Sequence, residues 1–338
     1  MKCGFASFKE NKHQDFFSKR DHSNIVLFKT KLNTIYSGTH DIYLERISHS
    51  SPRNGSPLFP RKQTEYFNEV MLQSFNNGTT IRILDVQENR INIDQLYSFS
   101  TLKHMQVKII DPDEPDYAND CLVYCYEYIN FLKEHNVKYP FSELYVLYNV
   151  PDLENAFWNG SYLTFGNGSK ESYPFVSAAI VAHELTHSLI QSSINLEYYG
   201  DSGALNESYC DIIGVMFEFW LHERHNGIGY ELGSELFKDG HSLRSFADPN
   251  KCGQPTSIRD HLFYRGYQDN GGVHINSSLT NHCFYKMQLL RDKKIIFDLF
   301  MKVFFKLRSN TNFSEFKHLL LTYIINDLDL VNIVNEIL

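Results

Sequence analysis

The sequence predicts an α+β protein of two lobes, with strands and helices mixed in the first lobe and helices alone in the second. Its 338 residues are enough for two lobes and one further segment. Helical and strand-like patterns alternate up to about residue 200, and strand-like patterns become scarce after Gly203. We therefore expect a cleft between the two lobes, which is a common place for a binding site.

We expect the chain to divide into three segments, 1–78, 79–200 and 201–338. The first is polar and rich in Ser, Asn and His, with Pro and Gly between Ser51 and Arg61. Such a composition predicts little periodic structure, so this segment is interpreted as an N-terminal extension. The second segment would form the mixed lobe and the third the helical lobe.

Each lobe has its own predicted elements. The mixed lobe should contain a helix over Asp116 to Glu134, strands over Glu143 to Asn149 and Phe157 to Phe165, and a helix over Val176 to Ser193. Another helix is predicted from Gly203 to about Arg224. The remaining apolar residues recur at helical spacing over Gly272 to Leu290, Lys294 to Leu307, Phe313 to Ile325 and Leu328 to Leu338.

The pentapeptide from His183 to His187 places two imidazoles four residues apart on a predicted helix. At about 3.6 residues per turn, both rings share one face, where a single metal ion can bind both nitrogens. Zinc suits such a pair, and Glu184 lies beside it in the position of a general base. The alternative is an amphipathic helix that carries two solvated or hydrogen-bonded histidines and a surface glutamate.

Glu207 and Asp211 share one face of the next predicted helix. A carboxylate from Glu207 can complete a set of two His and one Glu, which leaves a fourth position for water. Asp211, one turn later, can accept the second ring N–H of a ligand histidine. Two carboxylates on a solvated face are the alternative, but this would leave unexplained why a polar cluster interrupts an apolar run.

Together these residues resemble the thermolysin family of neutral zinc metallopeptidases. Asn155 to Gly160 resembles the family's edge-strand motif, which holds an extended peptide. Ser242 to Ser245, followed by Asp248-Pro249, resembles the segment with its carbonyl-binding arginine, and Asp269 to Ser277 resembles its second signature. The four motifs occur in the family's order over about residues 82–338, and the resemblance implies a two-lobed thermolysin-like fold with the zinc cleft between the lobes.

Carried over by position, the resemblance implies that His183, His187 and Glu207 bind Zn2+ while Glu184 activates a zinc-bound water. Asp211 would orient His183, and Asn206 would lie with it behind the metal ligands. No covalent acyl-enzyme is needed in such a reaction.

The resemblance also assigns oxyanion and substrate contacts. His274, held by Asp269, and Tyr198 would donate hydrogen bonds to the oxyanion of the tetrahedral intermediate. The implied substrate contacts are Asn155, the Ala156 backbone, Arg244, and the apolar residues Ile180, Leu243 and Tyr173-Pro174-Phe175. Two alternatives stay open: Tyr198 could be an ordinary tyrosine in a chain that has 21 of them, and Arg244 could be a surface charge.

The implied activity is that of a zinc metalloendopeptidase with protein or peptide substrates and a preference for bulky hydrophobic residues after the scissile bond. Segment 1–78 lies where the family carries a propeptide, and Asp41 to Ile47 resembles the short propeptides of the protealysin-like branch. The enzyme would then be made as a self-processing precursor, cut near Ser74 to Thr79. The alternatives are an extension without an inhibitory role and, for Cys3, a thiolate that blocks zinc.

The chain departs from the family pattern where calcium is usually bound. Ala179 stands four residues before His183, where an aspartate is usual, and Gly229 and Ser234 replace further carboxylates. Glu218 and Glu231 remain. Because calcium prefers six to eight oxygen ligands, we expect the paired calcium site to be degraded.

Composition excludes several classes of partner. The net charge is −8 and basic residues occur only as scattered pairs, so neither nucleic acid nor a membrane is expected as a partner. We expect a monomer. The N-terminus lacks the apolar segment of a Sec signal peptide, and the six irregularly spaced cysteines are typical of reduced thiols. Residence in the cytoplasm and secretion by a non-Sec route both stay open.

Two other functional classes compete with this interpretation. A zinc hydrolase of another kind, such as an aminopeptidase, could use two His and one Glu, but it would give no role to Asn155 to Trp158 or His274. A catalytically inactive binding protein would require the loss of a catalytic group, and every group that the resemblance identifies is present.

Overall fold

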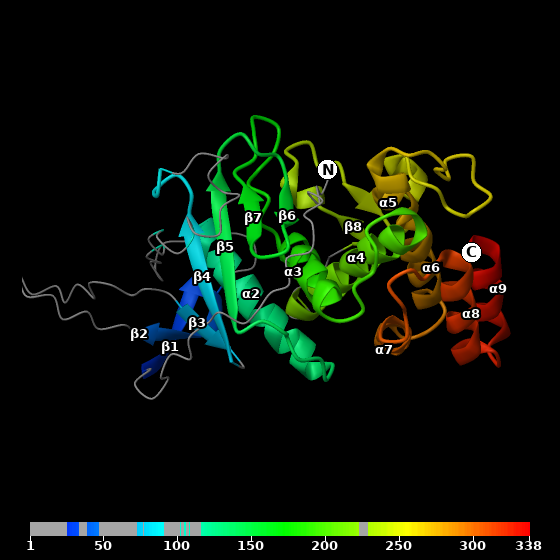
Figure 1. Ribbon diagram of the computed structural model, residues 1–338, viewed down its shortest axis with the longest axis horizontal. Helices are drawn as coiled ribbons and strands as arrows, with labels where there is room; N and C mark the ends of the chain where they lie inside the picture. Colours follow the sequence, from blue (N-terminus) through cyan, green and yellow to red (C-terminus); the bar gives the residue numbers. More distant parts are fainter. Residues whose placement is uncertain are drawn as a thin grey trace, which may run out of the picture.

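The structure is a computed structural model that describes residues 26–33, 39–46, 73–76, 78–90, 102, 105, 108, 116–222 and 229–338. A sheet forms one side of the molecule, two long helices cross its centre, and further helices form the other side (Figure 1). The α+β fold with a helical C-terminal part therefore agrees with the prediction.

One seven-stranded sheet carries the N-terminal part, in the order β1-β2-β3-β4-β5-β7-β6. Strands β4, β5 and β7 are parallel to one another, and the other neighbours are antiparallel. The strands are β1 (Val26–Asn33), β2 (Thr39–Arg46), β3 (Gln73–Asn76), β4 (Thr79–Asp85), β5 (Glu143–Val150), β6 (Ala156–Trp158) and β7 (Leu163–Gly166). Strand β6 therefore forms one edge of the sheet.

Three of these strands precede residue 79, where the sequence predicts little periodic structure. Strands β1 and β2 form an antiparallel hairpin, β2 pairs with β3 at Leu44 and Ser74, and β3 pairs with β4 from Gln73 to Asn76. The segment before residue 79 thus extends the sheet of the N-terminal part. The division at residue 79 stays a prediction.

Strand β5 lies in the middle of the sheet and is covered on both faces. Leu144, Val146 and Tyr148 belong to the main core, while Tyr145 and Leu147 belong to a smaller core on the opposite face. Successive side chains of a strand point to opposite faces, so this alternation is expected for a strand covered by two layers. Its buried ends position the loops that follow the parallel strands.

Helices α2 (Tyr117–Glu134) and α3 (Ala178–Ser192) pack together in the main core. Two buried hydroxyl pairs join the helix α3 to tyrosines of the N-terminal part: Tyr128 and Thr186 lie 2.8 Å apart, and Tyr139 and Ser188 lie 2.9 Å apart. Buried hydroxyls need such partners, so these pairs help to define how α3 sits.

The sequence pattern predicts one strand over 157–165, whereas the structure forms a hairpin of β6 and β7. The Asn159 side chain accepts hydrogen bonds from the backbone N–H groups of Ser161 and Tyr162, and Gly160 has a φ of 95°. Such a left-handed position favours glycine. The tight turn between the apolar residues explains why the two short strands resemble one longer strand in the sequence.

The C-terminal part is helical, as predicted, apart from two strands of two residues each and two short 3-10 helices. The single helix predicted over Gly272 to Leu290 occurs instead as two shorter helices. The helices are α4 (Gly200–His222), α5 (Asp269–Asn276), α6 (Ser278–Gln288), α7 (Lys293–Phe304), α8 (Phe313–Ile324) and α9 (Leu328–Ile337). The short elements are β8 (Glu231–Leu232), β9 (Arg244–Ser245), η3 (Ser234–Leu236) and η4 (Pro249–Cys252).

Membrane-spanning helices and disulfides are both absent from the described part of the chain. No helix there has the length and apolar character that crossing a bilayer requires. None of the five cysteines in the described residues forms a disulfide, and four of them are buried.

Candidate active site

Helices α3 and α4 cross closely at the centre of the molecule (Figure 1). A Cβ atom on Gly214 would lie only 2.6 Å from the backbone oxygen of Ala179, so the helices approach here at a distance that requires glycine. The side chain of Ser177 caps the N-terminus of α3 by accepting a hydrogen bond from the Ile180 N–H. This contact brings His183 and His187 on α3 opposite Glu207 on α4.

Three side chains converge on one point between these helices. The Nε2 atoms of His183 and His187 lie 3.1 Å apart. The Glu207 carboxylate lies 3.5 Å from the first and 3.4 Å from the second. All three residues are buried, and two imidazoles with one carboxylate are a donor set that suits zinc. The residues present therefore fit a bound Zn2+ ion.

The charges of these groups are those that metal ligands need. Burial raises the pKa of Glu207, but the imidazoles of His274, His187 and His183 outweigh burial and hold it well below its usual range. Burial lowers the pKa of His187 to about 4, although the nearby Glu207 opposes this shift. A carboxylate and a neutral imidazole are the forms that bind metal.

Behind His183, three residues form a chain of polar contacts. The Nδ1 atom of His183 lies 2.9 Å from Asp211, and the Asp211 carboxylate also lies 2.7 Å from Nε of Arg244. Asn281 donates a hydrogen bond of 2.8 Å to the same carboxylate. Burial raises the pKa of Asp211, but Arg244 and His183 outweigh it, so the carboxylate stays ionised. These contacts hold the ring of His183 in one orientation.

Behind His187 lie Asn206, as predicted, and Cys210, which no sequence motif indicates. The Nδ1 atom of His187 lies 3.0 Å from the Asn206 side-chain oxygen and 3.3 Å from the Cys210 sulfur. Among the described residues, His183, His187 and Cys210 could by proximity hold a metal ion. However, the thiol lies at Nδ1 of His187, whereas Glu207 lies at Nε2, the atom that faces His183.

His274 lies on the other side of Glu207, together with Tyr198. The Nε2 atom of His274 is 3.4 Å from the Glu207 carboxylate and 3.2 Å from the Tyr198 hydroxyl, which itself donates to Glu207. Asp269 holds the His274 ring at 2.5 Å and accepts its backbone N–H at 2.9 Å. The two side chains that are predicted to bind an oxyanion therefore lie next to each other and next to Glu207.

An unusual backbone presents His274. Residues 269–272 all have positive φ, with values of 53°, 49°, 85° and 82° for Asp269, Asn270, Gly271 and Gly272. Tyr264 packs so closely that a Cβ on Gly272 would lie 2.6 Å from its ring. Gln254, another residue that the sequence did not reveal, donates a hydrogen bond of 2.6 Å to the His274 backbone oxygen.

Glu184 is fully buried beside His183, and it is tied to the edge strand of the sheet. The backbone N–H of Trp158 donates a hydrogen bond of 2.9 Å to the Glu184 carboxylate. Residues 155 and 157 direct their backbone groups to β7, because Gly166 N–H bonds to the Asn155 oxygen at 2.9 Å. In an antiparallel pair, Ala156 and Trp158 therefore direct theirs away from β7, at the open edge of the sheet.

The residues predicted to bind substrate side chains come from α3 and from the segment around β8 and β9. Ile180 is buried on α3, and Leu243 is half-buried, with its N–H bonded to the Leu232 oxygen at 2.9 Å. Leu243 also covers Gly233. Arg244 is almost completely buried and contacts Asp211 and, at 3.8 Å, Glu207. The alternative that Arg244 is a surface charge is therefore wrong.

The residues of the expected calcium region form a different cluster. Ala179 is completely buried and offers no side-chain oxygen. Glu231 accepts a hydrogen bond of 2.7 Å from Ser245. Glu218 lies near the carboxylate of Glu235. Burial, together with the charge of Glu235, raises the pKa of Glu218 to about 8.

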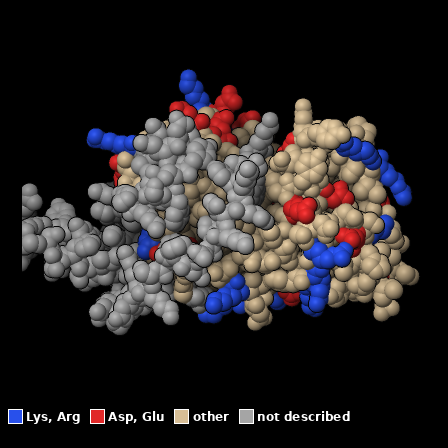
Figure 2. Space-filling model, viewed as in Figure 1, with Lys and Arg blue, Asp and Glu red and all other residues tan. Residues whose placement is uncertain are grey.

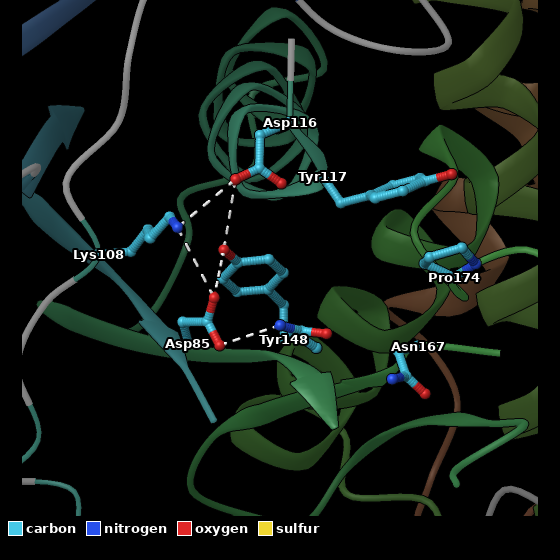
Figure 3. Close-up of a pocket in the computed structure, with 8 residues that line it drawn as sticks. Asp85, Lys108, Asp116, Tyr117, Tyr148, Asn167 and Pro174 are labelled. Carbon is cyan, nitrogen blue, oxygen red and sulfur yellow. Dashed lines mark hydrogen bonds and ion pairs between the residues drawn. The ribbon is translucent and has the colours of Figure 1, made fainter. Parts of the chain in front are cut away.

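Away from this site, a polar cavity of about 230 Å³ lies at the carboxyl ends of the parallel strands β4, β5 and β7 (Figure 3). Lys108 faces both Asp85 and Asp116 at 3.7 Å, and Tyr148 donates a hydrogen bond of 2.9 Å to Asp85. Burial lowers the pKa of Lys108, but Glu88 and the two aspartates outweigh it. This cluster joins the N-terminus of α2 to the sheet, with Lys108 as its internal counter-ion.

Comparison with known proteins agrees with this geometry. Residues 65–191 match the profile of the thermolysin metallopeptidase catalytic domain, and residues 194–325 match that of the thermolysin metallopeptidase alpha-helical domain. The chain belongs to the thermolysin metallopeptidase family. The two profiles meet where α3 ends and α4 begins, so the candidate site is assembled from both.

Individual relatives resemble parts of the chain. Bacillolysin from Bacillus cereus is 41% identical over 141 residues, which are 40% of this chain and 24% of the relative. Thermolysin from Alicyclobacillus acidocaldarius subsp. acidocaldarius is 40% identical over 138 residues, or 39% of this chain and 24% of the relative. The chain thus spans about a quarter of the length of these curated relatives.

The fold also resembles a solved structure, the precursor of protealysin, a metalloproteinase from Serratia proteamaculans. The TM-score is 0.63, with 22% sequence identity, over 80% of this chain and 90% of the precursor. At this identity the likeness shows the fold alone. A thermolysin-like fold with an N-terminal α+β part and a helical C-terminal part is therefore confirmed.

Proposed function

We propose that this protein is a zinc metalloendopeptidase that hydrolyses peptide bonds in proteins or peptides. The observation that carries the proposal is the convergence of both histidine Nε2 atoms on the Glu207 carboxylate, within 3.5 Å. His183, His187 and Glu207 would hold Zn2+, which when bound supplies a Lewis acid that lowers the pKa of water and polarises a carbonyl oxygen.

In this proposal, Glu184 is the general base and then the general acid. Its carboxylate accepts a proton from the attacking water and passes that proton to the nitrogen of the leaving amine. The Trp158 N–H holds this carboxylate at 2.9 Å, so its position is set before substrate binds. A buried, pre-positioned base avoids reorganisation during the reaction.

His274 and Tyr198 then stabilise the negative oxygen that develops on the scissile carbonyl. Their donor atoms lie 3.2 Å apart, so both can point at one oxygen atom. Asp269 accepts from His274 Nδ1, so Nε2 donates to the oxyanion when the ring is a protonated imidazolium, whose charge the Asp269 carboxylate balances. Donors arranged in advance around developing charge are among the largest contributions to catalysis.

The edge of the sheet would hold the peptide main chain, through the Ala156 backbone and Asn155. Backbone pairing with an exposed strand is a common way to bind an extended peptide. Ile180 and Leu243 favour a bulky apolar side chain after the scissile bond, and Arg244 would hold a substrate carbonyl oxygen. We also propose synthesis as a precursor that processes itself.

Calcium would matter less here than is usual in the family. At Ala179, Gly229 and Ser234 no carboxylate is available, while Glu218, Glu231 and Glu235 remain. One of these carboxylates is already bonded to Ser245. We infer that the paired calcium site is degraded.

Replacing Glu184 by Gln tests the proposed function. The variant should bind zinc with unchanged stoichiometry and lose about 10³-fold in kcat, because the metal ligands remain while proton transfer is lost. Elemental analysis measures the zinc, and hydrolysis of a peptide with Leu or Phe after the expected cut measures kcat. The exposed Glu336→Gln variant is the matched control, and full activity of Glu184→Gln would contradict the assigned role.

A further inference from the structure

An exposed carboxylate, Glu154, lies at the edge of the sheet just before strand β6. It is two residues before Ala156, the first residue of the strand. By the pairing of β6 with β7, residues 154, 156 and 158 share the same backbone direction, away from β7. A peptide held along this edge by Ala156 would therefore pass beside residue 154.

The order of contacts along the edge tells which part of a peptide would pass Glu154. The general base is opposite Trp158, because the Trp158 N–H bonds to Glu184. At the other end, Glu154 accepts a hydrogen bond of 3.1 Å from Ser172. Ser172 forms a β-bridge with Phe237, and the next residue, Tyr173, bonds through its N–H to the Leu236 oxygen.

These contacts place Glu154 on the same side of the reaction centre as the apolar residues. Leu236 lies in the segment of Leu232 and Gly233, which Leu243 covers. The first residue after the scissile bond would insert its side chain among these apolar groups. Because a strand advances about 3.4 Å per residue and alternates its side chains, the second residue would point out of the pocket and beside Glu154.

The carboxylate of Glu154 is held in place rather than free to move with a loop. The backbone on either side is tied to the strand β7 region: Gly168 N–H bonds to the Leu153 oxygen at 3.3 Å, and Gly166 N–H bonds to the Asn155 oxygen at 2.9 Å. Gly166 also packs directly against the Leu153 backbone, where no Cβ would fit. A charge held in advance loses little entropy when it pairs with a ligand.

Acidic side chains gather on this part of the surface. Figure 2 shows several Asp and Glu side chains, with a Lys or Arg side chain beside them, at the upper edge of the N-terminal part, above the ends of β5 and β7. Asp152, Glu154 and Glu171 are exposed in these loops. The neighbouring Lys238 bonds through Nζ to the backbone oxygens of Ser169 and Lys170, so its ammonium group is turned toward those carbonyls.

We propose that Glu154 selects substrates with a basic side chain, Lys or Arg, at the second residue after the scissile bond. The proposal rests on the proposed peptidase function and adds a charge preference to it. An ammonium or guanidinium group beside Glu154 would form a partly exposed ion pair, and a carboxylate at the same place would be repelled.

The test uses three peptides that differ only at the second residue after the cut, which is Lys, Gln or Glu, with Leu as the first. For the zinc-loaded full chain we expect kcat/KM for the Lys peptide to exceed that for the Glu peptide about fivefold, as for one screened ion pair. In Glu154→Gln, which keeps an oxygen to accept from Ser172, the ratio should fall to about 1 because the charge is gone.

The Glu336→Gln variant should keep the wild-type ratio, and 0.5 M NaCl should reduce that ratio, since salt screens a partly exposed pair. Equal cleavage of the three peptides, or a ratio that Glu154→Gln does not change, would overturn the assignment of Glu154 while leaving the peptidase function intact. Failure to cleave any of the three peptides would instead overturn the proposed function itself.

Discussion

Cys210 lies behind the ring of His187 and shares its Nδ1 atom with Asn206. Residues in this position orient a metal ligand, and their loss commonly weakens metal affinity by about 10- to 100-fold. A thiol is a weak hydrogen-bond acceptor, so its contribution should lie at the lower end of this range.

We therefore expect Cys210→Ala to weaken zinc binding about 10-fold, while Cys210→Ser, which keeps a polar atom of similar size, stays close to the wild type. Competition with a chromogenic chelator measures the zinc Kd of both variants. Circular dichroism checks that they are folded. If both variants bind zinc as tightly as the wild type, Cys210 has no part in positioning His187.

At the same scale, the sequence reveals the residues that converge at the candidate site better than those that lie behind them. His183, His187 and Glu184 stand within one pentapeptide, so helical spacing alone brings them together. Gln254 and Cys210 act from elements whose arrangement the sequence does not reveal. The Gln254 side chain bonds to the backbone of His274, and a contact to the backbone requires no particular side chain at its partner, so no sequence motif indicates it.

Among the elements, long amphipathic helices are predicted well and the sheet is predicted poorly. The helix predicted over Phe313 to Ile325 occurs as α8, Phe313–Ile324, because apolar periodicity and the Asn312 cap act within the segment itself. The sheet as a whole depends on distant pairings, of β2 with β3 at Leu44 and Ser74 and of β4 with β5, so its formation is not a local property.

The pairing of Glu218 on α4 with Glu235 on η3 makes the stability of this region depend on pH. The folded pKa of Glu218 is raised to about 8, so the folded state keeps a proton that the unfolded state loses above about pH 4.5. The stability that this proton contributes is complete below pH 4.5 and is lost as the pH rises to about 8.

Glu218→Gln should therefore raise the free energy of unfolding increasingly from pH 5 to pH 8, because the variant has no charge to bury. We expect about 2 kcal/mol at pH 8, less than the full shift implies, since Glu218 keeps some contact with solvent. Chemical unfolding at both pH values measures this, with Glu171→Gln as an exposed control.

Calcium added to the zinc-loaded wild type should raise Tm only slightly. A large, calcium-specific rise would show that the calcium site persists.

For the molecule as a whole, the continuous sheet bears on how a precursor could be processed. Strands β3 and β4 pair from Gln73 to Asn76, and this pairing includes most of the segment from Ser74 to Thr79 where the sequence predicts a cut. A peptidase that binds extended, unpaired chain would first have to open this hairpin.

We accordingly expect self-processing of the zinc-loaded full chain to spare the bonds within β3 and β4. Intact-mass measurement over time locates each cut. The Glu184→Gln variant, treated in the same way, should stay uncut and so exclude a contaminating protease. A cut within Gln73–Asn76 or within Thr79–Asp85 in protein that remains folded would contradict this prediction.

The bond between the Trp158 N–H and Glu184 has a mechanical consequence for the cleft. The strand that would align the peptide and the side chain that would move the proton are joined by one contact of 2.9 Å. Both belong to the N-terminal part of the fold, so a movement of the C-terminal part need not change their separation. A substrate could therefore be admitted between the two parts without disturbing the alignment between the bond to be broken and its base.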